Sequence, residues 1–283
     1  MFPLRGYQKK EQDTDAMPVC GFSGAVISDV GCVRENNEDN FVFERNRNRD
    51  SVDRYKMEVS CSELSSEWHV ACIFDGMGGG TGGEIASNTA AEVFLSNLNG
   101  LERSWTRAEI DLILRKAFLE ANNRILALRK EHPILGTTAT AFCSNGREFK
   151  IYYLGDSRAY LVREGSLVQM TKDQTLAQMK IDIGLYRKDD PQMEADRHKL
   201  TDFIGRDRTG ENICPEESSW MPLRKGDRIL LCSDGLTNMC SDEEISAFLL
   251  MAPTAADAVS KMVSAAKAKG GVDNITCIAI IFF

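Results

Sequence analysis

Four aspartates lie at the ends of apolar runs or in glycine turns. They are Asp75 in IFDG, Asp156 in YLGDS, Asp234 in LLCSDG and Asp273 in GGVDN. One aspartate in such a place is usually explained by turn chemistry. Several of them, separated by whole secondary-structure elements, suggest strand ends that meet at one rim. Such a rim would offer only oxygen ligands, which favours Mg²⁺ or Mn²⁺ over zinc.

Three further acids and one arginine lie near the N-terminal end. Asp29 in VISDVG resembles the four aspartates, and Glu38 and Asp39 open the apolar segment NFVF. Arg34 precedes them in the same polar loop. A guanidinium beside carboxylates and cations suits phosphate, because its planar donors pair with two oxygens at once. The alternative is a surface arginine paired with Glu35 or Glu38.

The segment 68–83, WHVACIFDGMGGGTGG, joins Asp75 to a run of glycines. The apolar residues 69–74 predict a buried strand that ends at Asp75, and a helix is predicted over 84–98. Because glycines have no side chain, a cation or a phosphate can approach the backbone that follows the Asp75 carboxylate closely. The glycines also satisfy the GxGxxG pattern of dinucleotide-binding proteins. However, Asp75 would repel a pyrophosphate, and repeated βαβ units are missing.

The remaining elements predict an α+β fold with antiparallel sheets. Hairpins are predicted at Asn145-Gly146 and Glu164-Gly165, and a surface loop or ragged hairpin over 45–67. Thr106, followed three residues later by Glu109, predicts a capping box at the start of a second long helix. Further helices are predicted at 176–179, 242–250 and 254–269. Helices set between runs of hairpins argue against alternating βαβ units.

Composition excludes several classes of partner. The 283 residues carry a formal net charge of −8 without a basic block, which argues against nucleic acid or an anionic membrane as the main partner. No apolar run approaches the ~20 residues of a transmembrane helix, and the first residues lack the hydrophobic core of a secretory signal. Nine cysteines without a CxxC pair predict a reduced, cytoplasmic protein.

Five blocks, in order, resemble the metal-dependent protein phosphatases, the type 2C serine/threonine phosphatases. The blocks are SDVGCVRENNEDNF (28–41), FDGMGGGTGGEIAS (74–87), GTTATAF with YYLGDSRAYLV (136–162), LLCSDGLTN (230–238) and GGVDNIT (270–276). The resemblance implies a four-layer α-β-β-α sandwich of two antiparallel sheets flanked by helices. It also implies a short polar tail, 1–19, and a single catalytic domain, 20–283, with a mobile flap at about 174–199.

The same resemblance implies a binuclear Mn²⁺ or Mg²⁺ centre. Asp75 matches the acid that bridges both metals, and Gly76 matches the residue that lends its backbone carbonyl. Asp234 and Asp273 match ligands of the second metal. Asp156 matches an acid that, together with Asp234, can hold a third, weaker metal in bacterial members.

Arg34 matches the phosphate-binding arginine of the family, while Glu38 and Asp39 match acids that hold metal-bound waters or bind metal weakly. Many eukaryotic members have a histidine where this chain has Met77, and a thioether cannot donate a proton to the leaving group. Methionine is common there in bacterial members, so the chain resembles that branch. None of the three histidines matches a family position.

The implied activity is hydrolysis of phosphoserine and phosphothreonine by a water activated between two metals, without a phosphoenzyme intermediate. The substrates would be phosphorylated proteins, in opposition to a serine/threonine kinase, and the enzyme is expected to be a monomer. The alternative is a catalytically weak pseudophosphatase that binds phosphoproteins as a regulatory module. Loss of the metal-binding acids would mark that alternative, and every matched acid is present.

Overall fold

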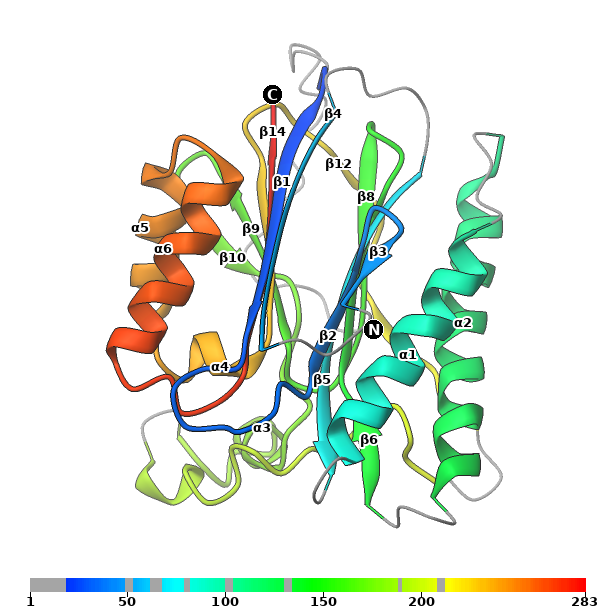
Figure 1. The fold of residues 1–283 in the computed structure, drawn as a ribbon, viewed down its shortest axis with the longest axis vertical. Helices are drawn as coiled ribbons and strands as arrows, with labels where there is room; N and C mark the ends of the chain where they lie inside the picture. Colours follow the sequence, from blue (N-terminus) through cyan, green and yellow to red (C-terminus); the bar gives the residue numbers. More distant parts are fainter. Residues whose placement is uncertain are drawn as a thin grey trace.

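The strands form two antiparallel sheets packed face to face, with helices outside each sheet (Figure 1). The computed structural model describes residues 19–48, 53–61, 68–78, 82–99, 104–129, 134–187, 190–207 and 212–283. Within them, the predicted α-β-β-α sandwich is confirmed. The predicted tail, 1–19, lies outside the described residues except for Val19. In the described part of the chain, no helix is long and apolar enough to cross a membrane.

The first sheet has the strand order β10-β9-β13-β14-β1-β4. In that order its strands are Ser166–Gln169, Arg158–Arg163, Arg228–Cys232, Ile275–Phe282, Phe22–Asp29 and Arg54–Cys61. The central strand β14 reads ITCIAIIF, because one face packs on the other sheet and the other on α6. The edge strand β4 corrects the prediction of a surface loop or a ragged hairpin over 45–67, since it pairs with β1 along its whole length. Its sequence alternates polar and apolar residues, and Tyr55, Met57, Val59 and Cys61 pack against the core between the sheets, which is the period-2 pattern of a half-buried strand.

The second sheet has the order β11-β8-β7-β5-β2-β3, with β12 paired to β8 and β6 paired to β5. In that order these strands are Glu216–Glu217, Glu148–Leu154, Ala139–Ser144, His69–Gly78, Asp39–Phe43 and Asn46–Arg47, then Met221–Pro222 (β12) and Leu135–Thr137 (β6). The prediction that β5 ends at Asp75 is wrong. The strand continues to Gly78 because β6 supplies backbone partners and Asp39 of β2 lies opposite Asp75.

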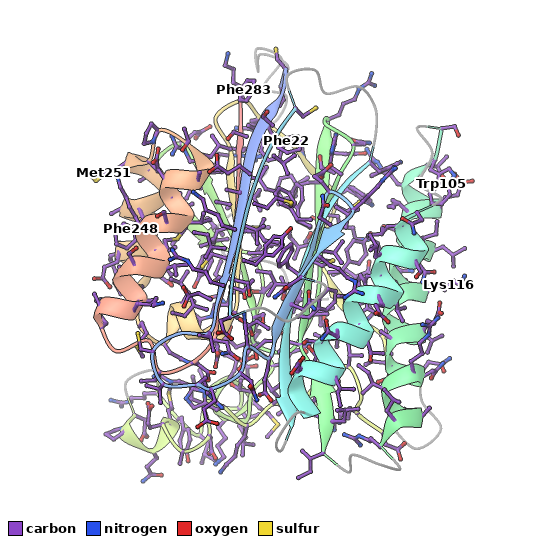
Figure 2. All side chains as sticks on the ribbon, in the orientation of Figure 1. Phe22, Trp105, Lys116, Phe248, Met251 and Phe283 are labelled. Atoms are coloured by element: carbon purple, nitrogen blue, oxygen red, sulfur yellow. The ribbon has the colours of Figure 1, made fainter. Side chains whose placement is uncertain are left out.

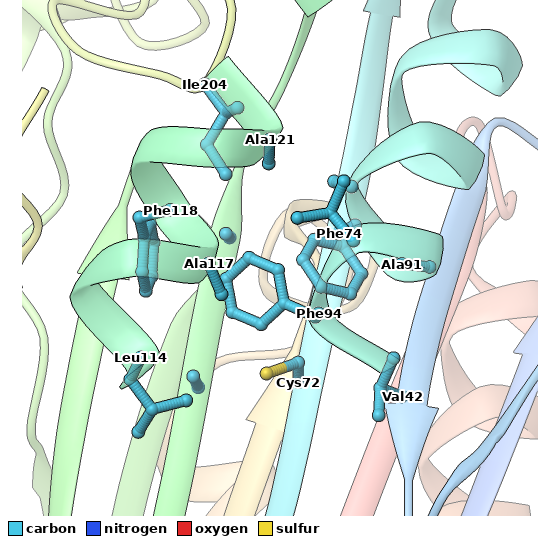
Figure 3. Packing of buried hydrophobic residues seen from close by; sticks show 14 of the residues in the cluster. Val42, Cys72, Phe74, Ala91, Phe94, Leu114, Ala117, Phe118, Ala121 and Ile204 are labelled. Atoms are coloured by element: carbon cyan, nitrogen blue, oxygen red, sulfur yellow. The ribbon is translucent and has the colours of Figure 1, made fainter. Parts of the chain in front are cut away.

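Two helix pairs cover the sheets (Figure 1). The helices α1 (Gly82–Leu98) and α2 (Arg107–Leu128) lie on the second sheet, whereas α5 (Asp242–Met251) and α6 (Ala255–Ala268) lie on the first. The predicted capping box at Thr106 is confirmed. Under α1 and α2, the rings of Phe74, Phe94 and Phe118 form two edge-to-face contacts with centroids 5.0 Å apart (Figure 3).

Side chains also fill the space between the two sheets (Figure 2). The two predicted hairpins are confirmed: β7 and β8 flank Asn145-Gly146, and β9 and β10 flank Glu164-Gly165. The short helices α3 (Leu176–Asp182) and α4 (Asp234–Thr237), together with β6, gather at one end of the sandwich (Figure 1). The C-terminus lies at the opposite end (Figure 1). The rigid sandwich therefore presents a cluster of loops at one end, and the predicted site residues are found there.

Candidate metal centre

The predicted aspartates converge on Asp75 at this end of the sandwich. Burial raises the pKa of Asp75 well above its usual value, and four neighbouring carboxylates raise it further: Asp39, Asp234, Asp156 and Asp273. These acids come from β2, from the start of α4, from the turn between β8 and β9, and from the loop before β14. Elements of both sheets therefore place acids near Asp75.

Backbone hydrogen bonds hold Asp75 against the turn that carries Asp156. The Asp75 N–H donates to Thr138 Oγ1 at 3.0 Å, and the Thr138 N–H donates to the Asp75 carbonyl at 2.8 Å. The hydroxyls of Thr138 and Ser157 are hydrogen-bonded at 2.7 Å. Gly155 adopts a φ of +105°, and a Cβ there would lie 2.6 Å from the Thr138 methyl group. The turn therefore needs glycine beside Asp156.

Ser233 joins the second sheet to the first at Asp39. Its hydroxyl donates to Asp39 Oδ2 at 2.7 Å and accepts the Thr276 N–H at 2.9 Å. Burial raises the pKa of Asp39 to about 7, although the hydroxyl hydrogen bonds of Ser233 and Thr276 work in the opposite direction. Ser233 directly precedes Asp234, so this contact positions two of the predicted acids together.

Asn274 closes the loop that carries Arg34 and Glu38. Its side-chain oxygen accepts the Glu38 N–H at 2.8 Å, and its amide donates to the carbonyls of Val30 and Asn36 at 3.0 and 2.9 Å. The sequence analysis did not single out this residue, although it follows Asp273 in the matched block GGVDNIT. An asparagine with one acceptor and two donors suits such a loop closure.

The glycines around Glu38 are required by close packing. The Gly76 N–H donates to the Glu38 carbonyl at 3.2 Å, and a Cβ on Gly76 would lie 2.1 Å from the Gly83 carbonyl oxygen. A Cβ on Gly83 would lie 2.8 Å from Glu38 Oε2. Burial raises the pKa of Glu38, while the charge of Arg34 opposes that rise. The glycines thus bring the start of α1 against this acid.

Arg34 lies at the mouth of the cluster and contacts Asp273. Its Nη2 is 2.8 Å from Asp273 Oδ2, and this hydrogen bond raises the pKa of Arg34. The side chain is 50% exposed. The partner differs from Glu35 and Glu38, which the alternative interpretation named.

We expect Arg34→Ala to weaken phosphate binding more than it slows the chemical step. Loss of the guanidinium removes a charge-assisted partner for a phosphate oxygen, so KM for a phosphopeptide should rise about tenfold or more. Arg124→Ala is a matched control, because Arg124 is 51% exposed and pairs with Glu120 on α2. Steady-state kinetics measure both variants. An unchanged KM in Arg34→Ala would contradict the assignment.

His198 is a site residue that the sequence analysis missed. It belongs to the flap, residues 174–199, and its Nδ1 lies 3.4 Å from Asp234 Oδ2. The contact with Asp234 raises the pKa of His198. Asn238 also donates to Asp234 Oδ2, at 3.0 Å. A histidine in a charged, aperiodic segment carries no signal by itself, and only the fold of the flap places it here.

Asp29 resembles the site acids in sequence but has a different environment. Lys267 Nζ lies 2.7 Å from its Oδ1, and Arg54 Nε lies 3.5 Å from its Oδ2. Lys267 hydrogen-bonds to Oδ1, whereas Oδ2 has the charge of Arg54 nearby but accepts no hydrogen bond from a described residue. Asp29 therefore forms structural ion pairs that join β1 to β4 and α6.

The acid cluster fits a hard divalent cation in its donor chemistry. Its donors are carboxylate oxygens, and the raised pKa of Asp156, about 8, comes from burial and then from the charge of Asp234. A bound cation would relieve this repulsion. Among the described residues, no three His, Cys, Asp or Glu side chains lie close enough to form a metal-binding group by themselves. Asp273 and Asp234 instead contact Arg34 and His198.

A sandwich of two antiparallel sheets with acids from both sheets at one end defines the class of metal-dependent protein phosphatases. The chain matches the family Protein phosphatase 2C over residues 47–275 and belongs to it. The predictions of the family and of its fold are thereby confirmed. Members of this family depend on metal ions.

Two bacterial relatives illustrate the match. The chain is 33% identical over 257 residues to the serine/threonine protein phosphatase PstP of Mycobacterium tuberculosis, covering 90% of this chain but only 44% of PstP. It is 30% identical to the serine/threonine phosphatase stp of Listeria monocytogenes, covering 89% of this chain and 93% of the relative. The chain thus spans less than half the length of PstP and nearly all of stp.

Solved structures agree with the fold. The crystal structure of Mycobacterium tuberculosis PstP has a TM-score of 0.73 and 30% identity, covering 92% of this chain and 98% of that one. A crystal structure of the PstP catalytic domain in complex with two manganese ions has a TM-score of 0.70 and 30% identity, covering 93% and 98% of the two chains.

Proposed function

We propose that this chain is a protein serine/threonine phosphatase that requires divalent metal ions. The observation that carries the proposal is the convergence of acids from both sheets around Asp75. The names of the relatives, which are serine/threonine phosphatases, support the same substrate class. Phosphorylated proteins are the proposed substrates, and a serine/threonine kinase is the proposed opposing enzyme.

The proposed cofactors are two Mn²⁺ or Mg²⁺ ions. Asp75 would hold both ions, and the Gly76 carbonyl would be a further ligand. Asp234 and Asp273 would hold the second ion. When bound, the ions would neutralise phosphate charge and lower the pKa of a water molecule. Asp156, beside Asp234, is the proposed ligand for a third, weaker site.

Residues near these ions would orient the phosphate group and ordered water. Arg34 is proposed to bind a phosphate oxygen, since it contacts Asp273 and its side chain is 50% exposed. Glu38 and Asp39 are proposed to accept hydrogen bonds from ordered water beside the ions. Met77 lies on β5 next to Gly76 and cannot transfer a proton, so its contribution is limited to packing.

A phosphate-release assay tests this proposal. With p-nitrophenyl phosphate and a phosphothreonine peptide, we expect turnover with Mn²⁺ or Mg²⁺ and background rates with EDTA. Binding of the phosphopeptide without metal-dependent phosphate release would instead support the pseudophosphatase alternative. A metal series in the same assay compares Mn²⁺ with Mg²⁺. A monomeric state and a cytoplasmic location remain predictions, which size-exclusion chromatography and cell fractionation would test.

A further inference from the structure

A cavity of about 600 Å³ lies beside the flap, outside the acid cluster. None of the roles proposed above uses its lining. The cavity is lined by side chains from the flap and from the segment that follows it: Gln174, Met179, Leu200, Thr201, Asp202 and Arg206.

One wall of the cavity is bonded to the turn that carries Asp156. The Gln174 N–H donates to the Gly155 carbonyl at 3.0 Å, and the Gly155 N–H donates to Gln174 Oε1 at 2.8 Å. Because Gly155 directly precedes Asp156, the wall and the acid cluster share one turn.

The other wall is bonded to the segment beside Asp75. Ile204 follows the lining residues and exchanges two backbone hydrogen bonds with Thr137, at 3.0 and 2.9 Å. The Thr137 hydroxyl donates to the Asp75 carbonyl at 2.9 Å. The Thr201 N–H donates to the Gln174 carbonyl at 2.7 Å, which joins the two walls. Both segments that line the cavity are therefore hydrogen-bonded to the elements that carry Asp75 and Asp156, which places the cavity next to the acid cluster.

The chemistry of the lining favours an uncharged, apolar group. Met179 and Leu200 supply apolar surface, and Met179 is 45% exposed. Arg206 Nη1 lies 3.9 Å from Asp202 Oδ1, and Arg206 also donates to the Thr201 carbonyl. The two opposite charges offset each other, so the wall attracts neither an acidic nor a basic side chain strongly.

Apolar surface continues from the cavity onto the flap. The Ile183 N–H donates to the Met179 carbonyl at 3.2 Å, so these two residues share one face of the α3 turn. Ile183 and Leu185 are both exposed. Exposed apolar side chains grouped beside a polar site are typical of a surface that binds another protein.

We propose that this cavity binds an apolar side chain of the phosphoprotein substrate, a few residues from the phosphorylated serine or threonine. The inference rests on the proposed phosphatase function and adds a sequence preference to it. The phosphate group binds at the acid cluster beside Arg34, while the apolar side chain contacts Met179 and Leu200.

A leucine scan tests the preference. Phosphothreonine peptides carry one leucine in a serine-glycine host, moved through about four positions on either side, or roughly 13 Å of extended chain. A leucine-free peptide and p-nitrophenyl phosphate complete the set. We expect kcat/KM with Mn²⁺ to rise about tenfold when the leucine reaches the cavity, as for a methylene group or more in an apolar pocket.

Three variants test whether the leucine preference depends on Met179. Met179→Ser should abolish the leucine preference, that is, the ratio of kcat/KM for the best leucine peptide to the leucine-free peptide. Met179→Leu should retain it. Met251→Ser is the matched control, because Met251 is an exposed methionine on α5, at a distance from the flap, and should leave the ratio unchanged (Figure 2).

The possible results show whether the apolar-pocket inference fails alone or together with the proposed phosphatase function. Equal kcat/KM for all peptides in the wild type, or a leucine preference that survives Met179→Ser, would overturn the inference alone. Absence of metal-dependent hydrolysis of every substrate would overturn the proposed function and the inference with it.

Discussion

Asp75→Asn is expected to lower kcat with Mn²⁺ by about 10³-fold or more, while the protein stays folded. The substitution keeps the shape of the side chain and removes one charge from the centre of the acid cluster. Asp75 is the acid that all the others surround, so its loss weakens both proposed metal sites at once. The effect should exceed that of Arg34→Ala, which leaves every acid in place. Turnover of a phosphopeptide measures the loss.

A stability measurement separates this result from misfolding. In EDTA at pH 8, Asp75→Asn should melt at or above the wild-type temperature, because it removes a buried carboxyl whose ionised form is disfavoured by burial and by four neighbouring carboxylates. Asp257→Asn, at the start of α6, is a matched control that should retain activity. Near-normal turnover in Asp75→Asn would contradict the assignment of Asp75 as a metal ligand.

The metal-free protein is expected to lose stability as the pH rises from about 5 to 8. The pKa of Asp39 is raised to about 7 and that of Asp156 to about 8, both by burial first. An unfolded aspartate has a pKa of about 3.9. Between these values the folded state holds more protons than the unfolded state, so its stability falls as the pH rises. Over this range each of the two groups accounts for a loss on the order of 3 kcal/mol.

Thermal melts in EDTA at pH 5 and pH 8 measure this effect. The two losses together, about 6 kcal/mol, lower Tm by roughly 10–20 °C for a domain of this length. Mn²⁺ should restore Tm most strongly at pH 8, where the acids are ionised. Asp156→Asn should make the metal-free protein less sensitive to pH, because one of the titrating groups is gone. A metal-free Tm that rises steadily over this range would refute the raised pKa values.

Local features of the fold could be predicted because they depend on short stretches of chain. The hairpin at Asn145-Gly146 and the capping box at Thr106 each follow from a few neighbouring residues. The strand β4 carries the alternation of a half-buried strand, but the hydrophilic residues before and after it favour the interpretation as a surface loop or a ragged hairpin. The end of β5 was misplaced at Asp75, because β6, which extends the strand, comes from a segment about sixty residues further on.

The residue types alone indicate that the available ligands are carboxylate oxygens, which suit hard divalent cations, because ligand chemistry belongs to the residue type. The sequence also determined the family, since the five blocks keep their order along the chain. The tertiary structure alone decided that Arg34 contacts Asp273 and that His198 contacts Asp234. It also decided that Asn274 closes the loop at Glu38, 236 residues away in sequence. Such contacts depend on how two sheets and a flap pack together, and no local pattern encodes that packing.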